Sequence, residues 1–304
     1  MKYITITFDF EGKWGMPYKG RYDLVKTTHR LLEVLDTYNV NAVFFVVGKI
    51  IEEYPDLIKE IAKNGHEIAI HGYTHERLDR LTKEDLTTFS VNLCRIELTL
   101  EKLTGKRPIG FRSPYLMAPR FYTLELYKLL EEHGYQWVSN CELRYPEELF
   151  RPDRLRFPYL WGKNNWFTNI LFILLNIRLL ITETIHDKSG LSRITDNLQW
   201  LNRGTEPFKR GNLIEIPLYS PLDCDLLGLP NLETRTPDIW VKYAVDCLVG
   251  GLNRKGKYYM LNFHDWIIGT SNRVLLLGNI LKFLSFDENN KIITVSSLVR
   301  LINK

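Results

Sequence analysis

The chain has 304 residues, of which 45% are hydrophobic and 25% charged, a composition typical of a folded globular protein rather than a disordered one. Its 40 basic and 36 acidic residues give a net charge of only +4. This near balance argues against a dedicated nucleic-acid-binding protein, which concentrates lysine and arginine on one face.

Short apolar runs rich in β-branched and aromatic residues predict β-strands. In chain order they are 2–10, 41–48, 66–72, 108–114, 135–140, 213–218 and 258–264. Longer amphipathic segments between them predict helices over 23–38, 55–64, 82–104, 120–133, 236–253 and 272–285. Thr82 and Asp85 resemble a capping box, and Gly65 and Gly105 are candidate helix stops.

Alternating strands and helices without a β-hairpin signal predict a mainly parallel sheet with helices outside it. Seven or eight such strands suit a distorted parallel (β/α) barrel, with the active site at the carboxyl ends of the strands. A doubly wound open sheet is the second possibility, but no GxGxxG follows the first strand. We expect one catalytic domain over 1–304, with an insertion at about 141–212 that interrupts the alternation of strands and helices.

Polar residues that a buried strand has no structural reason to hold lie at four of the strand ends. They are Asp9 and Glu11, His71 and His75, Arg112 with Ser113, Pro114 and Tyr115, and His264. Because the carboxyl ends of parallel barrel strands meet at one face, we expect these residues to converge in one pocket.

The spacing of these residues favours a metal site. His71 and His75 are four residues apart, which places two imidazoles on one side of a helical turn, and a carboxylate would complete a three-ligand zinc site. Asp9 and Glu11 are two apart on a strand and should point to the same side. Two facing carboxylates are costly unless a cation or proton lies between them. A metal held by one of them, with the other acting as a base, removes this conflict.

These motifs resemble those of the polysaccharide deacetylases, or carbohydrate esterase family four. TFDFE at 7–11, HGYTH at 71–75, FRSPY at 111–115 and LNFH at 261–264 are similar, in this order, to the family's first, second, third and fifth motifs. The resemblance covers roughly residues 3–140 and 210–300. It implies a metal-dependent hydrolase that removes an N-acetyl or similar acyl group from a sugar or glycan.

The resemblance also implies a role for each residue. One divalent ion, zinc first and cobalt, nickel, manganese or iron as alternatives, would be held by Glu11, His71 and His75. Asp9 would be the general base and Arg112 would orient it. The backbone N–H of Tyr115 would stabilise the oxyanion, and His264 would protonate the departing amine.

Two departures from the family pattern leave questions open. Glu11 is offset by one residue from the usual adjacent aspartate and is one methylene longer, so Asp9 and Glu11 could exchange roles. The fourth motif, which supplies an aspartate that tunes the catalytic histidine, is not clear. Asp153 and Asp223 are candidates, whereas Asp265 is expected to face solvent.

Two other functions stay open: a metal-free hydrolase of ring amides, like allantoinase, and an inactive barrel that binds glycans. The complete ligand set, with Asp9 and His264, argues against both. Because a strand is predicted from Lys2 onward, we expect no signal peptide, and the four cysteines form no CxxC pair. We therefore expect a cytoplasmic enzyme that acts on a nucleotide sugar, a lipid-linked sugar or a surface-polysaccharide precursor.

The apolar segment 166–181 (WFTNILFILLNIRLLI) stands inside the expected insertion. It is short for a membrane span, which needs roughly 20 apolar residues. It predicts either a helix buried against the barrel or an interfacial helix that lies on a membrane. We hypothesise the second, with the helix guiding a lipid-linked substrate to the active site.

Overall fold

The computed structural model describes residues 1–16, 22–78, 82–116, 124–140, 142–143, 206–219, 223, 257–270 and 273–303. Its main sheet contains the strands β1 (Lys2–Phe10), β2 (Val43–Val46), β3 (Glu67–Ile70), β4 (Gly110–Phe111), β5 (Trp137–Val138), β7 (Phe208–Arg210), β8 (Leu213–Glu215), β10 (Tyr258–His264) and β11 (Asn290–Ile292). A separate short pair joins β6 (Glu142–Leu143) to β9 (Leu218–Tyr219).

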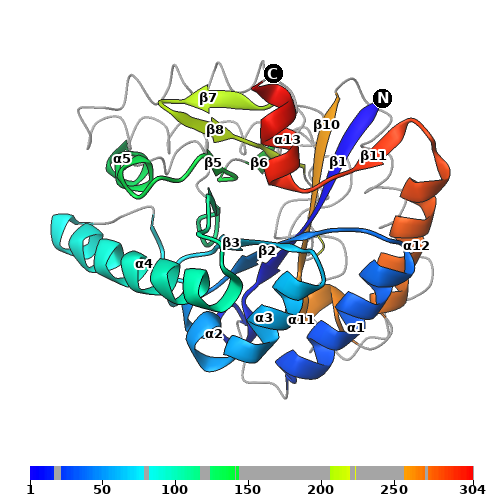
Figure 1. Ribbon diagram of the computed structural model, residues 1–304, viewed down its shortest axis with the longest axis horizontal. Helices are drawn as coiled ribbons and strands as arrows, with labels where there is room; N and C mark the ends of the chain where they lie inside the picture. The colour runs from blue at the N-terminus through cyan, green and yellow to red at the C-terminus, as the bar shows by residue number, and fades with distance from the viewer. Residues whose placement is uncertain are drawn as a thin grey trace, which may run out of the picture.

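The strands run in the order β10-β1-β2-β3-β4-β5-β8-β7, with β11 also on β1, and all pairs except β7–β8 are parallel. The sheet curls into a half-barrel with helices on its outer side (Figure 1). The predicted parallel α/β barrel is therefore confirmed in its distorted form, and each predicted strand contains a strand of the structure.

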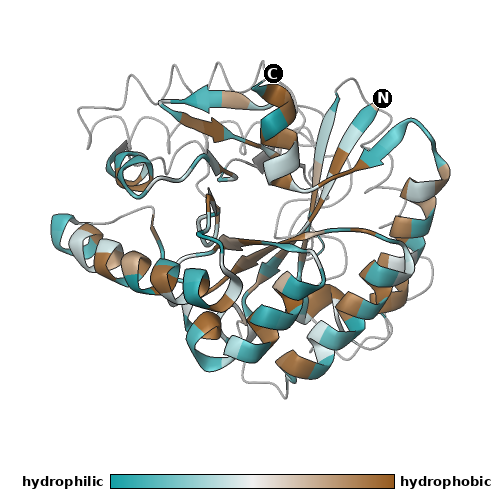
Figure 2. Cartoon of the chain, viewed as in Figure 1, coloured by the Kyte–Doolittle hydropathy of each residue, from teal (hydrophilic) through white to brown (hydrophobic). Residues whose placement is uncertain are grey.

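The helices are α1 (Leu24–Thr37), α2 (Gly48–Glu53), α3 (Pro55–Lys63), α4 (Lys83–Thr104), α5 (Leu124–Glu132), α11 (Asp265–Ile268), α12 (Arg273–Phe286) and α13 (Val295–Ile302), with a 3₁₀ turn η1 (Gly12–Trp14). The capping box of Thr82 with Asp85 is present, and Gly105 ends α4 at φ 71°. Figure 2 shows brown and teal segments alternating along α1, α3 and α4, as expected for helices with one apolar face.

The mainly parallel sheet contains one antiparallel pair that was not predicted, the hairpin of β7 and β8. Arg210 pairs with Leu213, so Gly211 and Asn212 form a two-residue turn in which Gly211 has φ 59°. A glycine in the left-handed region permits this tight reversal at no steric cost.

Side chains along β1 alternate between two apolar layers. Ile4, Ile6, Phe8 and Phe10 face the helices in the larger core, whereas the residues between them face the inside of the half-barrel. The inner layer contains Phe45, Trp137 and Met260 and is closed by α13. Ser296 in the first turn of α13 donates its N–H to Glu67 at the start of β3 (3.0 Å), so α13 covers the amino ends of the strands.

Several predictions lie outside the described residues: the helix at 236–253, most of the insertion at 141–212 and the apolar segment 166–181. Within the part of the chain that the structure describes, no helix has the length and apolar character needed to cross a bilayer.

Candidate active site

The carboxyl ends of β1, β3, β4 and β10 bring the predicted residues together. Register places Asp9 on β1 directly beside His264 on β10, and Ile70 beside Phe111. His71 therefore follows β3 next to Arg112, which follows β4. The open end of the half-barrel, opposite α13, holds the whole predicted set.

Glu11, His71 and His75 form a buried group whose ligand atoms all lie within 4.8 Å of one another. Glu11 Oε1 lies 3.0 Å from His75 Nε2 and 3.3 Å from His71 Nε2. His71 Nδ1 lies 2.9 Å from the carbonyl oxygen of Arg112, which can only accept, so Nδ1 carries the proton.

The position of the proton on His71 indicates whether a cation fits between Glu11 and the two histidines. In the neutral imidazole of His71 the Nε2 lone pair then faces a Glu11 oxygen, which is unfavourable unless a proton or a metal ion lies between them. Two histidines and one carboxylate are also the ligand set of open, catalytic zinc sites. The residues present therefore fit a divalent ion.

Glu11 is held by both its backbone and its side chain. Its N–H donates to Asp265 Oδ1 (2.8 Å), and Trp266 Nε1 donates to Glu11 Oε2 (2.9 Å). Burial raises the pKa of Glu11, but His264 and the hydrogen bonds from the two ligand histidines outweigh burial and hold it well below its usual range.

Asp265 is completely buried, so the expectation that it faces solvent was wrong. It also accepts from the Gly12 N–H (3.2 Å) and from the Tyr22 hydroxyl. Burial raises its pKa to about 7, against the lowering effect of these hydrogen bonds. Asp265, the residue that follows His264, therefore anchors the turn after β1.

Asp9 lies between two partners that fix both of its oxygens. Arg112 Nη1 donates to Oδ1 (2.5 Å) and Asn262 Nδ2 donates to Oδ2 (2.9 Å). The Arg112 guanidinium is fully buried and stacks 3.7 Å above the Phe45 ring. Burial raises the pKa of Asp9, but Arg112 and the nearby histidines reverse this and hold it below its usual value. Asp9 is therefore a carboxylate that can accept a proton.

His264 is oriented by Asp223, one of the two aspartates that the sequence offered as candidates. Asp223 accepts from the His264 backbone N–H (2.7 Å) and lies 2.6 Å from Nδ1. His264 Nε2 is then directed into the site, 3.8 Å from Asp9 and 3.9 Å from Glu11. Burial lowers the pKa of His264, but Asp223 and the other two carboxylates raise it to about 10. Asp153, the other candidate, lies outside the described residues.

Tyr115 lies at the rim, 62% exposed, with its ring centroid 4.6 Å from that of His75. Its φ of 62° turns the backbone sharply after Pro114. Ser113 N–H donates to Asn140 Oδ1 (2.7 Å), and Asn140 N–H donates to the buried Glu215 (2.7 Å). Asn140 therefore fixes the loop that carries Tyr115, a link that no motif in the sequence indicated.

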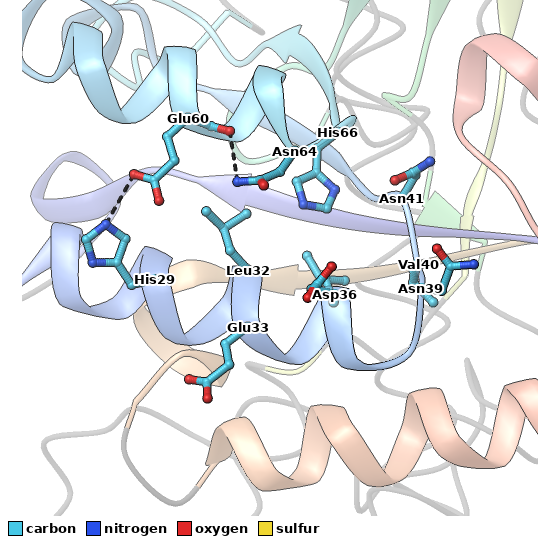
Figure 3. Close-up of a pocket in the computed structure, with 11 residues that line it drawn as sticks. His29, Leu32, Glu33, Asp36, Asn39, Val40, Asn41, Glu60, Asn64 and His66 are labelled. Carbon is cyan, nitrogen blue, oxygen red and sulfur yellow. Dashed lines mark hydrogen bonds and ion pairs between the residues drawn. The ribbon is translucent and has the colours of Figure 1, made fainter.

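A cavity of about 450 Å³ lies at the other end of the strands, between α1 and α3 (Figure 3). His66 and Asp36 both project into it. His66 Nδ1 accepts from the Ala42 N–H (3.2 Å), so the imidazole is neutral, and burial lowers its pKa to about 4. Because it borders the amino ends of β2 and β3, this cavity takes no part in the site at the carboxyl ends.

Comparison with known proteins finds similarity in the amino-terminal part of the chain. A family model described as polysaccharide deacetylase matches residues 1–138. The Bacillus cereus peptidoglycan-N-acetylglucosamine deacetylase is 33% identical over 120 residues, which cover 36% of this chain and 42% of that protein. The Helicobacter pylori peptidoglycan deacetylase is 32% identical over 131 residues, 42% of this chain and 37% of that protein. The matched part spans less than half of either relative.

Solved structures extend the similarity of fold to nearly the whole chain. A candidate polysaccharide deacetylase from Mycobacterium smegmatis superposes with a TM-score of 0.62 at 18% identity, covering 99% of this chain and 90% of that one. Puue allantoinase gives a TM-score of 0.57 at 14% identity, covering 98% and 89%. At these identities the likeness shows the fold alone, so the site residues must decide between activities.

Proposed function

From the premise that residues 1–138 belong to the polysaccharide deacetylase family, we propose that this protein is a metal-dependent hydrolase that removes an N-acetyl or similar acyl group from an amino sugar of a glycan. One observation carries this proposal: a buried Glu11–His71–His75 ligand group lies beside the Asp9 carboxylate and the His264 imidazole. A candidate base, a candidate acid and a candidate cation site are thus combined in one group of side chains.

The proposed reaction assigns one task to each side chain. A divalent ion bound by Glu11, His71 and His75 would supply Lewis acidity and a water molecule of lowered pKa. Asp9, kept ionised by Arg112, accepts the proton of the attacking water. Hydrogen bonds to both of its oxygens fix Asp9 in place, which explains the buried Asn262.

The second half of the reaction needs an acid, because an amine is a poor leaving group. The raised pKa of His264 keeps its imidazole protonated. Because Asp223 is paired with Nδ1, the second N–H of the ring, at Nε2, is directed into the site. It donates this proton to the nitrogen as the C–N bond breaks, giving the amine and a carboxylic acid. The backbone N–H of Tyr115 is proposed to hold the oxyanion during this step.

The substrate is proposed at the level of its class. One relative is named a peptidoglycan-N-acetylglucosamine deacetylase and the other a peptidoglycan deacetylase, so peptidoglycan is a candidate substrate in addition to the glycan precursors expected from the sequence. Zinc is the proposed ion on the chemistry of the ligand set. The cytoplasmic location and the membrane contact of 166–181 stay predictions, and cosedimentation of the full chain with anionic liposomes tests the second.

A metal-free ring-amide hydrolase is the competing function, since the allantoinase shares this fold. The ligand group favours the metal-dependent reaction. Without a cation, the Nε2 lone pair of His71 would face the Glu11 carboxylate, and this repulsion is removed when a cation lies between them.

Two substitutions test the proposal. His71→Ala should abolish both zinc binding and acetate release from N-acetylated glycan oligomers, with the chain still folded, because the residue lies at a strand end. Asp9→Asn should keep zinc but lower kcat about a hundred- to ten-thousandfold. Normal turnover by metal-free protein, or hydrolysis of allantoin in place of the glycan, would contradict the proposal.

A further inference from the structure

Three consecutive residues at the end of β10 contact the end of β1, although about 250 positions separate them in the sequence. His264 faces the two carboxylates, as described above. The next two residues both contact Glu11: Asp265 accepts its N–H (2.8 Å), and Trp266 Nε1 donates to its Oε2 (2.9 Å). Glu11 is thus held at its main chain and at one carboxylate oxygen by neighbours on one short segment.

The contact with Trp266 determines which oxygen of Glu11 is available. Oε2 is engaged by the indole N–H, while Oε1 lies 3.0 Å from His75 and 3.3 Å from His71. A carboxylate with both oxygens unrestrained could rotate about its terminal bond and bind an ion in several ways. Hydrogen bonds from outside a ligand set fix the orientation of metal ligands and raise metal affinity.

Gly15 packs closely against this oxygen of Glu11. A Cβ atom added to Gly15 would lie 1.6 Å from Glu11 Oε2, so only glycine at this position leaves room for the carboxylate. The residue adjacent to Asp9 is Phe10, which is fully buried in the core against the helices. The carboxylate ligand must therefore come from two residues after Asp9, at the start of the turn that Asp265 anchors.

We propose that Asp265 and Trp266 are positioning residues that direct Glu11 Oε1 toward His71 and His75, so that Glu11 is the metal ligand and Asp9 is left as the base. The proposal rests on the proposed function and deepens it. It also accounts for the offset of this carboxylate in the sequence, because a longer side chain on a turn needs more restraint than an aspartate on a strand.

The test measures zinc affinity on the metal-free full-length chain by competition with a chromophoric chelator. Trp266→Phe removes the N–H and keeps an aromatic ring, and it should weaken zinc binding about 10- to 100-fold. Trp14→Phe is the matched control, because Trp14 Nε1 is buried with no hydrogen-bond partner among the described residues. This control should bind zinc as the wild type does.

A positioning role is separated from a general loss of structure in two ways. Asp265→Asn can still accept the Glu11 N–H and should keep most of the affinity that Asp265→Ala loses. In a Glu11→Ala background, Trp266→Phe should cause no further loss of zinc affinity, because it acts only through Glu11. If Trp266→Phe does not fold, Gly15→Ala serves instead, since its methyl group displaces Glu11 Oε2.

The outcomes separate the two proposals. Wild-type affinity in folded Trp266→Phe, or an equal loss with and without Glu11, overturns the positioning role and leaves the proposed function standing. Absence of zinc binding by the wild type overturns the metal-dependent function itself, and the positioning role with it.

Discussion

Replacing His66 with asparagine should flatten the dependence of stability on pH in mildly acidic solution. His66 is 8% exposed, lies with its ring centroid 5.4 Å from that of Phe44 at an interplanar angle of 55°, and accepts the Ala42 N–H at Nδ1. Protonation would place an N–H against this donor, within the buried wall of the cavity in Figure 3. Burial accordingly lowers the pKa from 6.5 to about 4, although the Asp36 carboxylate opposes this.

The magnitude follows from linkage between protonation and folding. The pKa falls from 6.5 to about 4, a difference of about 2.5, which corresponds to about 3 kcal/mol at most. The unfolded chain binds a proton below its own pKa, whereas the folded chain does so only near pH 4. His66 therefore contributes its full stability above about pH 6.5, and this contribution is lost as the pH falls, by about 2 kcal/mol at pH 5.

Urea unfolding between pH 7.5 and pH 5, in the presence of a chelator, measures this contribution without interference from metal release. His66→Asn keeps an acceptor for the Ala42 N–H and cannot titrate, so it should lose about 2 kcal/mol less than the wild type over this range. His29→Asn is the control, because this side chain is 53% exposed on the same cavity. The other charged groups that line the cavity are Glu33, Asp36 and Glu60. Equal pH dependence in wild type and His66→Asn would refute the reasoning.

Two further predictions concern the loop and the sheet. Asn140→Ala removes the acceptor of the Ser113 N–H and should lower kcat about ten- to a hundredfold with unchanged zinc affinity; steady-state kinetics and metal titration would detect a different pattern. Gly110→Ala places a methyl group 1.9 Å from the Trp137 indole and should lower the free energy of unfolding by about 1–3 kcal/mol, measured in urea; unchanged stability would mean that the indole can move aside.

The strands and the ligand group could be predicted because their signals are local. β1 carries Asp9 near its carboxyl end, and Glu11 follows where the strand gives way to a turn. His71 and His75 lie close together as predicted, with ring centroids 5.3 Å apart, but residues 71–75 do not form the expected helical turn, because Gly72 and His75 have φ of 71° and 60°. The carboxyl ends of parallel strands meet at one face, so these short patterns were enough to assemble the site.

The residues that support the site could not be predicted in the same way. Asp265 looks in the sequence like a charged residue after a strand, yet α11 begins there and buries it against Glu11. Asp223 and Asn140 likewise act through contacts with distant residues, which no local pattern encodes. The hairpin is a different case, because Gly211-Asn212 is a local turn signal that can be recognised in the sequence.

The pairing of β1 with β10 has a consequence for how the chain folds during synthesis. Tyr3 to Asp9 lie against Tyr258 to His264, so the long edge of β1 has no partner until more than four fifths of the chain has left the ribosome. Contacts between such distant segments form slowly, and an unpaired strand edge can bind other chains in the meantime. A fragment that ends at residue 138, the limit of the family match, would expose this edge permanently and lack His264. Expression of that fragment should therefore give aggregated protein even though it carries all three proposed metal ligands.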